Sequence, residues 1–415
     1  MALQIAIIGS GLAGLAAARI LRVHHEVTVY ERSGPDTATG GQGICLFPNG
    51  IKILQAMGFD RDRAGAVSCH GYRTFDKDGN LVKDFPVDFK GKYGADTMAM
   101  KRSDFRDELL RLATAPSEDL GIQGSPAKMV CDTSVVDVDP DEGLVFFKNG
   151  SSVQADVVVG VLLTNWYDRK TADGKIVANG VHSRLRHRIV SSSCQPKKNG
   201  MTCYRVAISA ESVKEALGYL PEWWDPRTAD SRISTLIAGD GSKRMVAAYP
   251  LRHYDYMNFS CLFPTRQDKG HVLDSWFADG DRQEMVDTFN DFSYPLRKIL
   301  DIATEVKVWE LQDLDSLPHW NKGRAILIGD AAHAMTPMQG QGSNMAIEDA
   351  DSFHLLRPGI SRDEVKEVLK QIDGIRRPRT ARVLRDTRAM AKGISMDEMI
   401  ANLDFNCGYN GVFEG

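Results

Sequence analysis

The chain has 415 residues, of which 43% are hydrophobic and 26% charged, and its formal net charge is −4 at pH 7. These values are typical of an ordinary globular protein and give no reason to expect nucleic acid or an anionic membrane surface as a partner. No apolar run approaches the ~20 residues that would span a bilayer, so we expect no stable membrane association. The seven cysteines are dispersed and never form a CxxC pair. This favours reduced thiols in a cytoplasmic protein over a disulfide framework or a zinc site.

The first part of the chain predicts alternating strands and helices. Residues 4–9 form a continuous apolar run of the kind buried in a parallel sheet. Residues 12–22 are rich in Ala and Leu and predict a helix, and residues 26–31 predict the next strand. Two more helices are predicted around 49–57 and 103–112. The chain therefore opens as a βαβ unit.

The remainder of the chain predicts a β-rich lobe followed by a return to alternating elements. Residues 129–160 contain β-rich segments separated by turn sequences, which predicts a meander, and residues 200–265 alternate in β fashion. A helical stretch, a strand, a helix and a polar helical tail follow at 284–300, 324–329, 343–356 and 362–400. A nucleotide-binding α/β core with a β-rich lobe inserted into it fits this order best.

A glycine motif joins the first strand to the first helix. Gly9, Gly11 and Gly14 form GxGxxG, in which the glycines permit a tight turn, the approach of a pyrophosphate and close helix–strand packing. The helix N-terminus then presents N–H groups to the phosphates. Glu31 ends the second strand, where its carboxylate can accept both ribose hydroxyls of an adenosine. The alternative is a glycine-rich structural turn, and the motif alone does not separate FAD from NAD. The residues expected to bind the dinucleotide here are Gly9, Gly11, Leu12, Ala13, Gly14, Glu31 and Arg32.

A second glycine-rich segment decides between the two cofactors. Residues 323–350 read GRAILIGDAAHAMTPMQGQGSNMAIEDA. They resemble the GD motif of class A FAD-dependent aromatic monooxygenases, which have the p-hydroxybenzoate-hydroxylase-type fold. The resemblance extends upstream through 309–320 and is to salicylate-hydroxylase-like members in particular. It implies that Asp330 binds the ribityl hydroxyls of FAD. It also implies that the GQG loop and the helix after it place N–H donors at the flavin N1–C2=O edge, from Gly340, Gly342 and Ser343.

Other segments resemble the same family in the same order. Gly43 lies in a GQGICLFPNG segment similar to the one that passes beside the isoalloxazine ring, and Arg102 matches the arginine that contacts the cofactor. Arg205 and Tyr249 fall where these enzymes have strands lining the substrate pocket. The resemblance implies that they bind or ionise a phenolic or carboxylate substrate, although a strand Arg or Tyr is as often structural. With Pro337 of the GD motif they form the predicted catalytic set.

One motif of the family is interrupted in this chain. A strand ends at Gly160, and in the family such a strand runs directly into Gly-Ala-Asp-Gly-x-x-Ser-x-x-Arg, which touches FAD and the nicotinamide cofactor. Here the motif resumes only at Ala178, after seventeen intervening residues. Its aspartate is replaced by Asn179, which remains a predicted cofactor ligand. Our hypothesis is that residues 161–177 are foreign to the site, protrude from it and weaken cofactor or NAD(P)H binding.

Several conspicuous residues are predicted to be structural. His333 is expected to order the GD loop, and Cys45 to pack near the flavin without reacting. A basic run in the C-terminal tail is expected to form a solvated helix face, because acidic residues lie just upstream. It consists of Arg376, Arg377, Arg379, Arg382, Arg385 and Arg388. No histidine forms an HxxxH or another metal pattern, so no metal is predicted.

The resemblance implies an α/β fold with an FAD-binding Rossmann-like core of the glutathione-reductase type, an inserted β-rich substrate lobe and C-terminal helices. The discontinuous FAD-binding domain is predicted at 1–69, 101–190 and 308–360, the substrate lobe at 70–100 and 191–307, and the helical region at 361–415.

The same resemblance implies a monooxygenase that consumes NADH or NADPH and O2. Its substrate would be a small phenolic or salicylate-like compound, hydroxylated through a flavin C4a-hydroperoxide. One alternative is a secondary-metabolite monooxygenase or epoxidase that acts on an indole, a polyketide or an alkene. An alternative of another class is a flavin-fold protein whose activity is impaired or lost because of the split motif. We expect a monomer or a homodimer.

Overall fold

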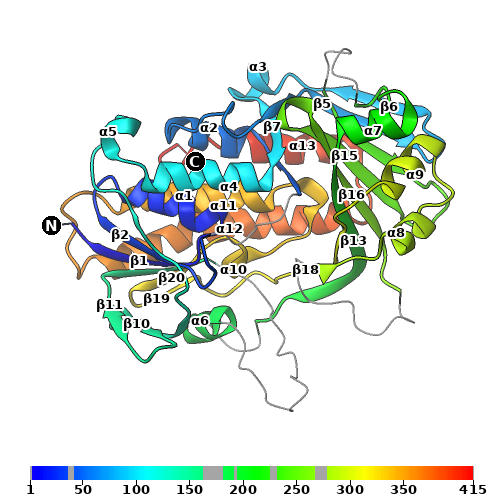
Figure 1. The fold of residues 1–415 in the computed structure, drawn as a ribbon. Coiled ribbons are helices and arrows are strands. Elements are labelled where there is room, and N and C mark those ends of the chain that lie inside the picture. Colours follow the sequence, from blue (N-terminus) through cyan, green and yellow to red (C-terminus); the bar gives the residue numbers. More distant parts are fainter. Residues whose placement is uncertain are drawn as a thin grey trace.

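The structure is a computed structural model that describes residues 2–35, 42–161, 181–190, 194–224, 231–266 and 278–414, the side chains of 181–184 excepted. It has two parts, a parallel sheet with helices stacked on it and a large, mainly antiparallel sheet beside it (Figure 1). The predicted α/β core with an inserted β-rich lobe is confirmed. No helix within the described ranges combines the length and the apolar character needed to cross a membrane.

A six-stranded sheet forms the centre of the first part. Its strand order is β19-β20-β12-β1-β2-β8, and every pair is parallel except β19 and β20. The strands are β1 (Gln4–Ile8), β2 (Glu26–Tyr30), β8 (Lys128–Val130), β12 (Val157–Gly160), β19 (Asn321–Lys322) and β20 (Ala325–Leu327). Ile8 pairs with Tyr30 on one side and with Gly160 on the other, and Gly160 pairs with Leu327. Four parallel strands therefore end at the same edge of the sheet, where nucleotides bind in open α/β folds.

The two faces of this sheet are covered differently (Figure 1). Four helices lie side by side over one face: α1 (Leu12–Leu21), α4 (Arg102–Thr114), α11 (Gly342–Asp351) and α12 (Val365–Met390). The predicted meander and a short helix cover the other: β9 (Val135–Asp139), β10 (Leu144–Phe147), β11 (Ser152–Gln154) and α6 (Val181–Ile189). All ten residues of α1 are buried, as its run of Ala and Leu allows, so this helix lies inside the core.

The second part is built on an eight-stranded sheet with the order β17-β18-β13-β16-β15-β14-β5-β6. Its strands are β5 (Gly71–Asp76), β6 (Leu81–Pro86), β13 (Lys197–Ser209), β14 (Ile233–Ile237), β15 (Met245–Leu251), β16 (Tyr256–Pro264), β17 (Ala278–Asp279) and β18 (Lys307–Asp313). A second hydrophobic core joins one face of this sheet to α7 (Ala210–Leu217), α8 (Arg282–Thr288) and α9 (Tyr294–Asp301). The opposite face of the sheet is turned toward the first part of the molecule. The predicted domain boundaries stay a prediction.

A small sheet joins the two parts. It has the order β3-β7-β4, and its β7 contacts β15 while β3 contacts β16. Its strands are β3 (Gly43–Leu46), β4 (Val67–Cys69) and β7 (Thr97–Lys101). The remaining described elements are α2 (Pro48–Ala56), α3 (Phe89–Tyr93), α5 (Ser117–Leu120), α10 (Asp330–His333), α13 (Met396–Cys407) and the 3-10 helices η2 (Arg252–Tyr254), η3 (Pro337–Gln339) and η4 (Ser352–Leu355).

Candidate active site

The GxGxxG turn lies at the edge where the parallel strands end. Gly9 has φ 108°, which favours glycine, and its N–H donates to the carbonyl of Tyr30. A Cβ on Gly14 would lie 2.2 Å from the Gly9 carbonyl oxygen and 3.2 Å from a side-chain carbon of Val161. Helix α1 can therefore pack this closely on the sheet only because position 14 has no side chain.

The start of α1 suits an anion. Gly11 precedes the helix in extended backbone, and no side chain caps the helix N-terminus within the part of the chain that the structure describes. Leu12 and Ala13 form the first turn, whose N–H groups have no partner inside the helix. An anion at this point would accept those groups and would be favoured by the helix dipole.

Glu31 lies just beyond the end of β2, beside this turn. Its carboxylate accepts the N–H and Oγ–H of Ser10, each at 2.9 Å, and the N–H of Ser33 at 3.0 Å. Burial opposes ionisation, but these hydrogen bonds and the charge of Arg32 hold the pKa of Glu31 below its usual range. The carboxylate is thus held in place and charged, which makes it a strong acceptor for ribose hydroxyls.

The GD segment reaches the same edge. Gly329 follows β20, and a Cβ at this position would lie 3.0 Å from the Cβ of Ala13, so the two glycine motifs lie side by side. Asp330 is the next residue and begins α10. Two arginines, Arg102 and Arg186, feel its charge. Burial lowers the pKa of both, that of Arg186 to about 10, and the negative charge of Asp330 opposes this shift.

Arg186 is a site residue that the sequence reasoning did not select, although the split motif ends on it. Its side chain is 1% exposed, and its Nε donates to the carbonyl of Ala331 at 3.1 Å. Its Nη2 is buried and has no hydrogen-bond partner among the described residues. Such a donor is costly to leave unpaired. A polar group of FAD next to Asp330 would satisfy it, so the residues present fit this cofactor.

The GQG loop lies against the segment that contains Gly43. A Cβ on Gly340 would lie 3.0 Å from the ring of Phe47. Asn344 joins the two segments, because its Oδ1 accepts the N–H of Phe47 at 2.9 Å and its Nδ2 donates to the carbonyl of Gly340 at 2.9 Å. Gly342 and Ser343 begin α11, whose N-terminus has no side-chain cap within the described chain.

Gly43 brings the cofactor side and the substrate side together. Its N–H donates to Asn258 Oδ1 at 2.8 Å, and a Cβ at this position would lie 2.6 Å from both Asn258 Cβ and Tyr249 Cε2. In the small sheet Gly43 pairs with Lys101, so Arg102 follows at once and donates its N–H to the carbonyl of Gln42. Three residues predicted from separate segments thus converge.

Arg205 and Tyr249 lie on the same face of the large sheet, the one turned away from the second core. Burial raises the pKa of Tyr249 above its usual range, and the charge of Arg205 opposes this less strongly. The phenol is therefore protonated at neutral pH and can donate a hydrogen bond. The guanidinium of Arg205 lies 3.9 Å from the centre of the Trp309 ring, and its Nε is buried without a partner among the described residues.

The neighbouring residue Tyr204 points the other way. Successive side chains of a strand alternate between faces, and Tyr204 stacks on Phe263 in the second core with ring centres 5.1 Å apart. Pro337 has an exposed side chain at the start of η3, and its carbonyl accepts the N–H of Gly340. Asn179 and the hypothesis about 161–177 fall on residues outside the described ranges, apart from Val161.

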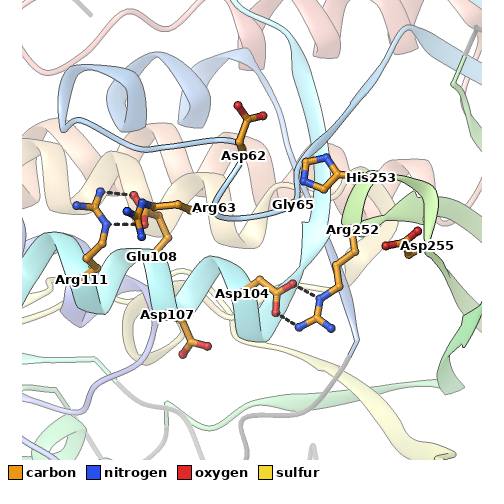
Figure 2. Close-up of a pocket in the computed structure, with 10 residues that line it drawn as sticks. All are labelled: Asp62, Arg63, Gly65, Asp104, Asp107, Glu108, Arg111, Arg252, His253 and Asp255. Atoms are coloured by element: carbon orange, nitrogen blue, oxygen red, sulfur yellow. Dashed lines mark hydrogen bonds and ion pairs between the residues drawn. The ribbon is translucent and has the colours of Figure 1, made fainter.

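A surface pocket of about 430 Å³ opens elsewhere, beside the first turns of α4. Figure 2 shows two ion pairs among its lining residues, Arg252 with Asp104 and, within α4, Arg111 with Glu108. None of the predicted site residues lines it. Arg252, which is close in sequence to Tyr249, is thus directed to the surface. Within the described ranges no group of three or more His, Cys, Asp or Glu residues could hold a metal ion.

The prediction of a solvated basic face in the C-terminal tail is wrong for part of the run. Arg376 in α12 is 0% exposed and forms ion pairs with Glu348 and Asp349, and Arg379 also pairs with Glu348. Spacing alone could not reveal this, because the carboxylates that neutralise these arginines come from another helix.

The profile of the FAD binding domain family matches residues 171–387, more than half of the chain. The chain belongs to this family. It is 27% identical over 389 residues to hispidin-3-hydroxylase from Neonothopanus nambi, and the aligned region covers 91% of this chain and 86% of that protein. It is 28% identical over 356 residues to 6-hydroxynicotinate 3-monooxygenase from Pseudomonas fluorescens, which covers 83% of this chain and 80% of that protein.

Solved structures agree on the fold. A substrate complex of salicylate hydroxylase matches with a TM-score of 0.68 at 21% identity, over 98% of this chain and 93% of that one. The predictions of class A family membership, of the fold and of a flavoprotein monooxygenase are confirmed at this level. FAD is the cofactor of the family, and the contacts above describe the edge that fits it.

Proposed function

We propose that this flavoprotein monooxygenase hydroxylates an aromatic substrate that carries an acidic group, a phenol or a carboxylate, with NADH or NADPH as the reductant. One observation carries the proposal. Arg205 and Tyr249 share the sheet face that meets Gly43 and Arg102, so a cation and a phenol lie next to the residues proposed to hold the flavin.

The side chains suggest a division of labour. The buried Nε of Arg205, which has no hydrogen-bond partner among the residues that the structure describes, would bind the carboxylate or phenolate. The Trp309 ring would keep the guanidinium plane in place. Tyr249 would donate a hydrogen bond and orient the ring. On the cofactor side, the α1 N-terminus and Glu31 would hold the adenosine diphosphate part, and Asp330, Arg102 and Arg186 the part next to it. FAD supplies the redox chemistry when it is bound.

The names of two related proteins support this substrate class, since 6-hydroxynicotinate and salicylate are both hydroxylated aromatic acids. The test is to purify the protein, establish that it is yellow and release FAD from it. NADH and NADPH oxidation are then measured with salicylate, with hydroxybenzoates and with neutral phenols. A phenolic acid should stimulate oxidation and appear as a hydroxylated product. A colourless protein that does not bind added FAD would refute the proposal.

A secondary-metabolite substrate is the second candidate. The likeness to hispidin-3-hydroxylase over 91% of the chain favours it. In the same assay this candidate predicts that neutral polyketide phenols, indoles or alkenes are converted and that simple phenolic acids are not.

The third candidate is a protein impaired by its interrupted motif. Deletion of residues 161–177 joins Gly160 directly to Ala178 and restores the spacing of the family. If the insert weakens the site, this variant binds FAD more tightly and oxidises NAD(P)H faster than the full chain. Equal values for the two proteins would identify the segment as a native loop.

A further inference from the structure

A buried set of charges lies behind the GD turn. Arg376 donates from Nη1 to Glu348 Oε2 at 2.6 Å, from Nε to Asp349 Oδ1 at 3.0 Å and from Nη2 to the carbonyl of Met345 at 3.3 Å. All three ionised side chains are 0% exposed. Two carboxylates so close together repel each other, and the planar guanidinium is the group that can bridge them.

Asp349 connects Arg376 to the turn of the GD motif, which contains Gly329 and Asp330. Its second oxygen, Oδ2, accepts the N–H of Gly329 at 2.9 Å and bonds to His333 Nε2 at 2.5 Å. Gly329 immediately precedes Asp330, and His333 ends the short helix that Asp330 begins. The two residues that flank this helix turn are thus held by one carboxylate, and that carboxylate is held by Arg376.

Glu348 makes a comparable contact with a second segment of the site. Its Oε1 accepts from Asn49 Nδ2 at 2.8 Å. Asn49 lies in the first turn of α2, directly after the segment of Gly43 and Phe47. The same arginine therefore stands behind two separate segments whose position decides the shape of the site.

We propose that Arg376 is a positioning residue of the flavin site, which acts through Asp349 on the Gly329–Asp330 turn and through Glu348 on the start of α2. The inference rests on the proposed use of FAD at this edge and is independent of the substrate. It gives Arg376, the buried arginine of the C-terminal basic run, a role in cofactor geometry.

The test measures FAD affinity of the apoprotein by flavin fluorescence, together with the visible circular dichroism of the bound flavin. Arg376→Lys keeps the charge but replaces the planar fork, whose three nitrogens each have their own partner, by one compact ammonium group, so its Kd for FAD should rise at least about tenfold, with an altered visible spectrum. A merely structural arginine would instead lower the melting temperature and leave Kd and spectrum unchanged in the folded protein. Arg388→Lys is the matched control, since Arg388 lies on the same helix and forms a two-pronged pair with Asp313. Its Kd should stay within about twofold of the wild type.

A double-mutant cycle with Asp349→Asn tests the route. Because Arg376 also acts through Glu348, the double variant should bind FAD somewhat more weakly than either single variant but clearly less weakly than the sum of the two losses predicts, whereas fully additive losses would overturn the proposal. An unchanged Kd for Arg376→Lys would overturn it too. Should that variant not fold, Arg376→Gln combined with Glu348→Gln removes one charge of each sign, and it has to show the same loss of FAD affinity. A wild-type protein that binds FAD but accepts no aromatic acid refutes the proposed substrate class and leaves this test in force.

Discussion

The two sides of the site are built from different parts of the polypeptide. On the cofactor side, strands of a parallel sheet stop at one edge, where the glycine turns and the N-termini of α1 and α11 lie. On the substrate side, Arg205 and Tyr249 project from within β13 and β15 of a largely antiparallel sheet. The first side tolerates few substitutions, because the backbone packs so closely there that an added Cβ at Gly14 would collide with the Gly9 carbonyl. The second side can change its chemistry when side chains on a strand face are replaced, which is how one fold can serve many different reactions.

Of the substitutions that test this difference between the two sides, one at Gly14 is expected to have the largest effect on FAD binding. In Gly14→Ala the new Cβ would lie 2.2 Å from the carbonyl oxygen of Gly9, so the backbone has to shift. We expect overpacking of about 1–3 kcal/mol or more and loss of most bound FAD, read from the flavin-to-protein absorbance ratio. The control is Gly374→Ala in α12, where a Cβ meets nothing within 4 Å. That change should stabilise the protein by up to about 1 kcal/mol.

Arg205→Gln should affect the substrate side alone. Loss of one charge-assisted hydrogen bond, worth about 1.5–3 kcal/mol, predicts a KM for an aromatic acid about 10–100 times higher. The Kd for FAD should stay near the wild-type value. Steady-state kinetics and a flavin titration measure the two quantities. Arg297→Gln, on α9 beyond the other face of the same sheet, is the control. An equal rise of KM for a neutral phenol would contradict the proposed role.

Tyr249→Phe sharpens the comparison, because it removes the hydroxyl and keeps the ring that packs on Gly43. A lost neutral hydrogen bond of about 0.5–1.5 kcal/mol predicts a fall of kcat/KM by roughly 2–10-fold. FAD binding should not change. Coupling is checked by the ratio of hydroxylated product to hydrogen peroxide. If kcat/KM is unaffected, Tyr249 only shapes the pocket.

The smallest effect is expected in the pH dependence of stability. Because the pKa of Glu31 is lowered in the folded protein, its ionised form stabilises the fold above the unfolded pKa of about 4.3. That contribution is lost as the pH falls from there through the folded pKa. The melting temperature of the wild type should therefore drop more steeply on acidification below about pH 4.5 than that of Glu31→Gln. Parallel curves for the two proteins would show that the carboxylate is not specially stabilised.

Much of the cofactor side could be predicted because its signals are local. Gly9, Gly11 and Gly14 have a spacing dictated by one turn and one helix, and Glu31 marks the end of the following strand. Arg186 escaped selection because seventeen residues separate the two halves of its motif. For Arg376 the sequence predicts an exposed position, because helical spacing describes a face without saying what covers it.

The sequence by itself determined the order of strands and helices, the two glycine motifs and the family that they resemble, since each depends on residues close together in the chain. Only the tertiary structure decided which side chains meet. The register that aligns Ile8, Gly160 and Leu327 brings three distant segments to one edge. Strand alternation puts Arg205 on the sheet face that it shares with Tyr249 and puts Tyr204 in the second core, and which face is covered by that core is decided only in the folded chain. Burial of Arg376 required two carboxylates of α11, because a charge leaves water only where opposite charges and hydrogen bonds replace it.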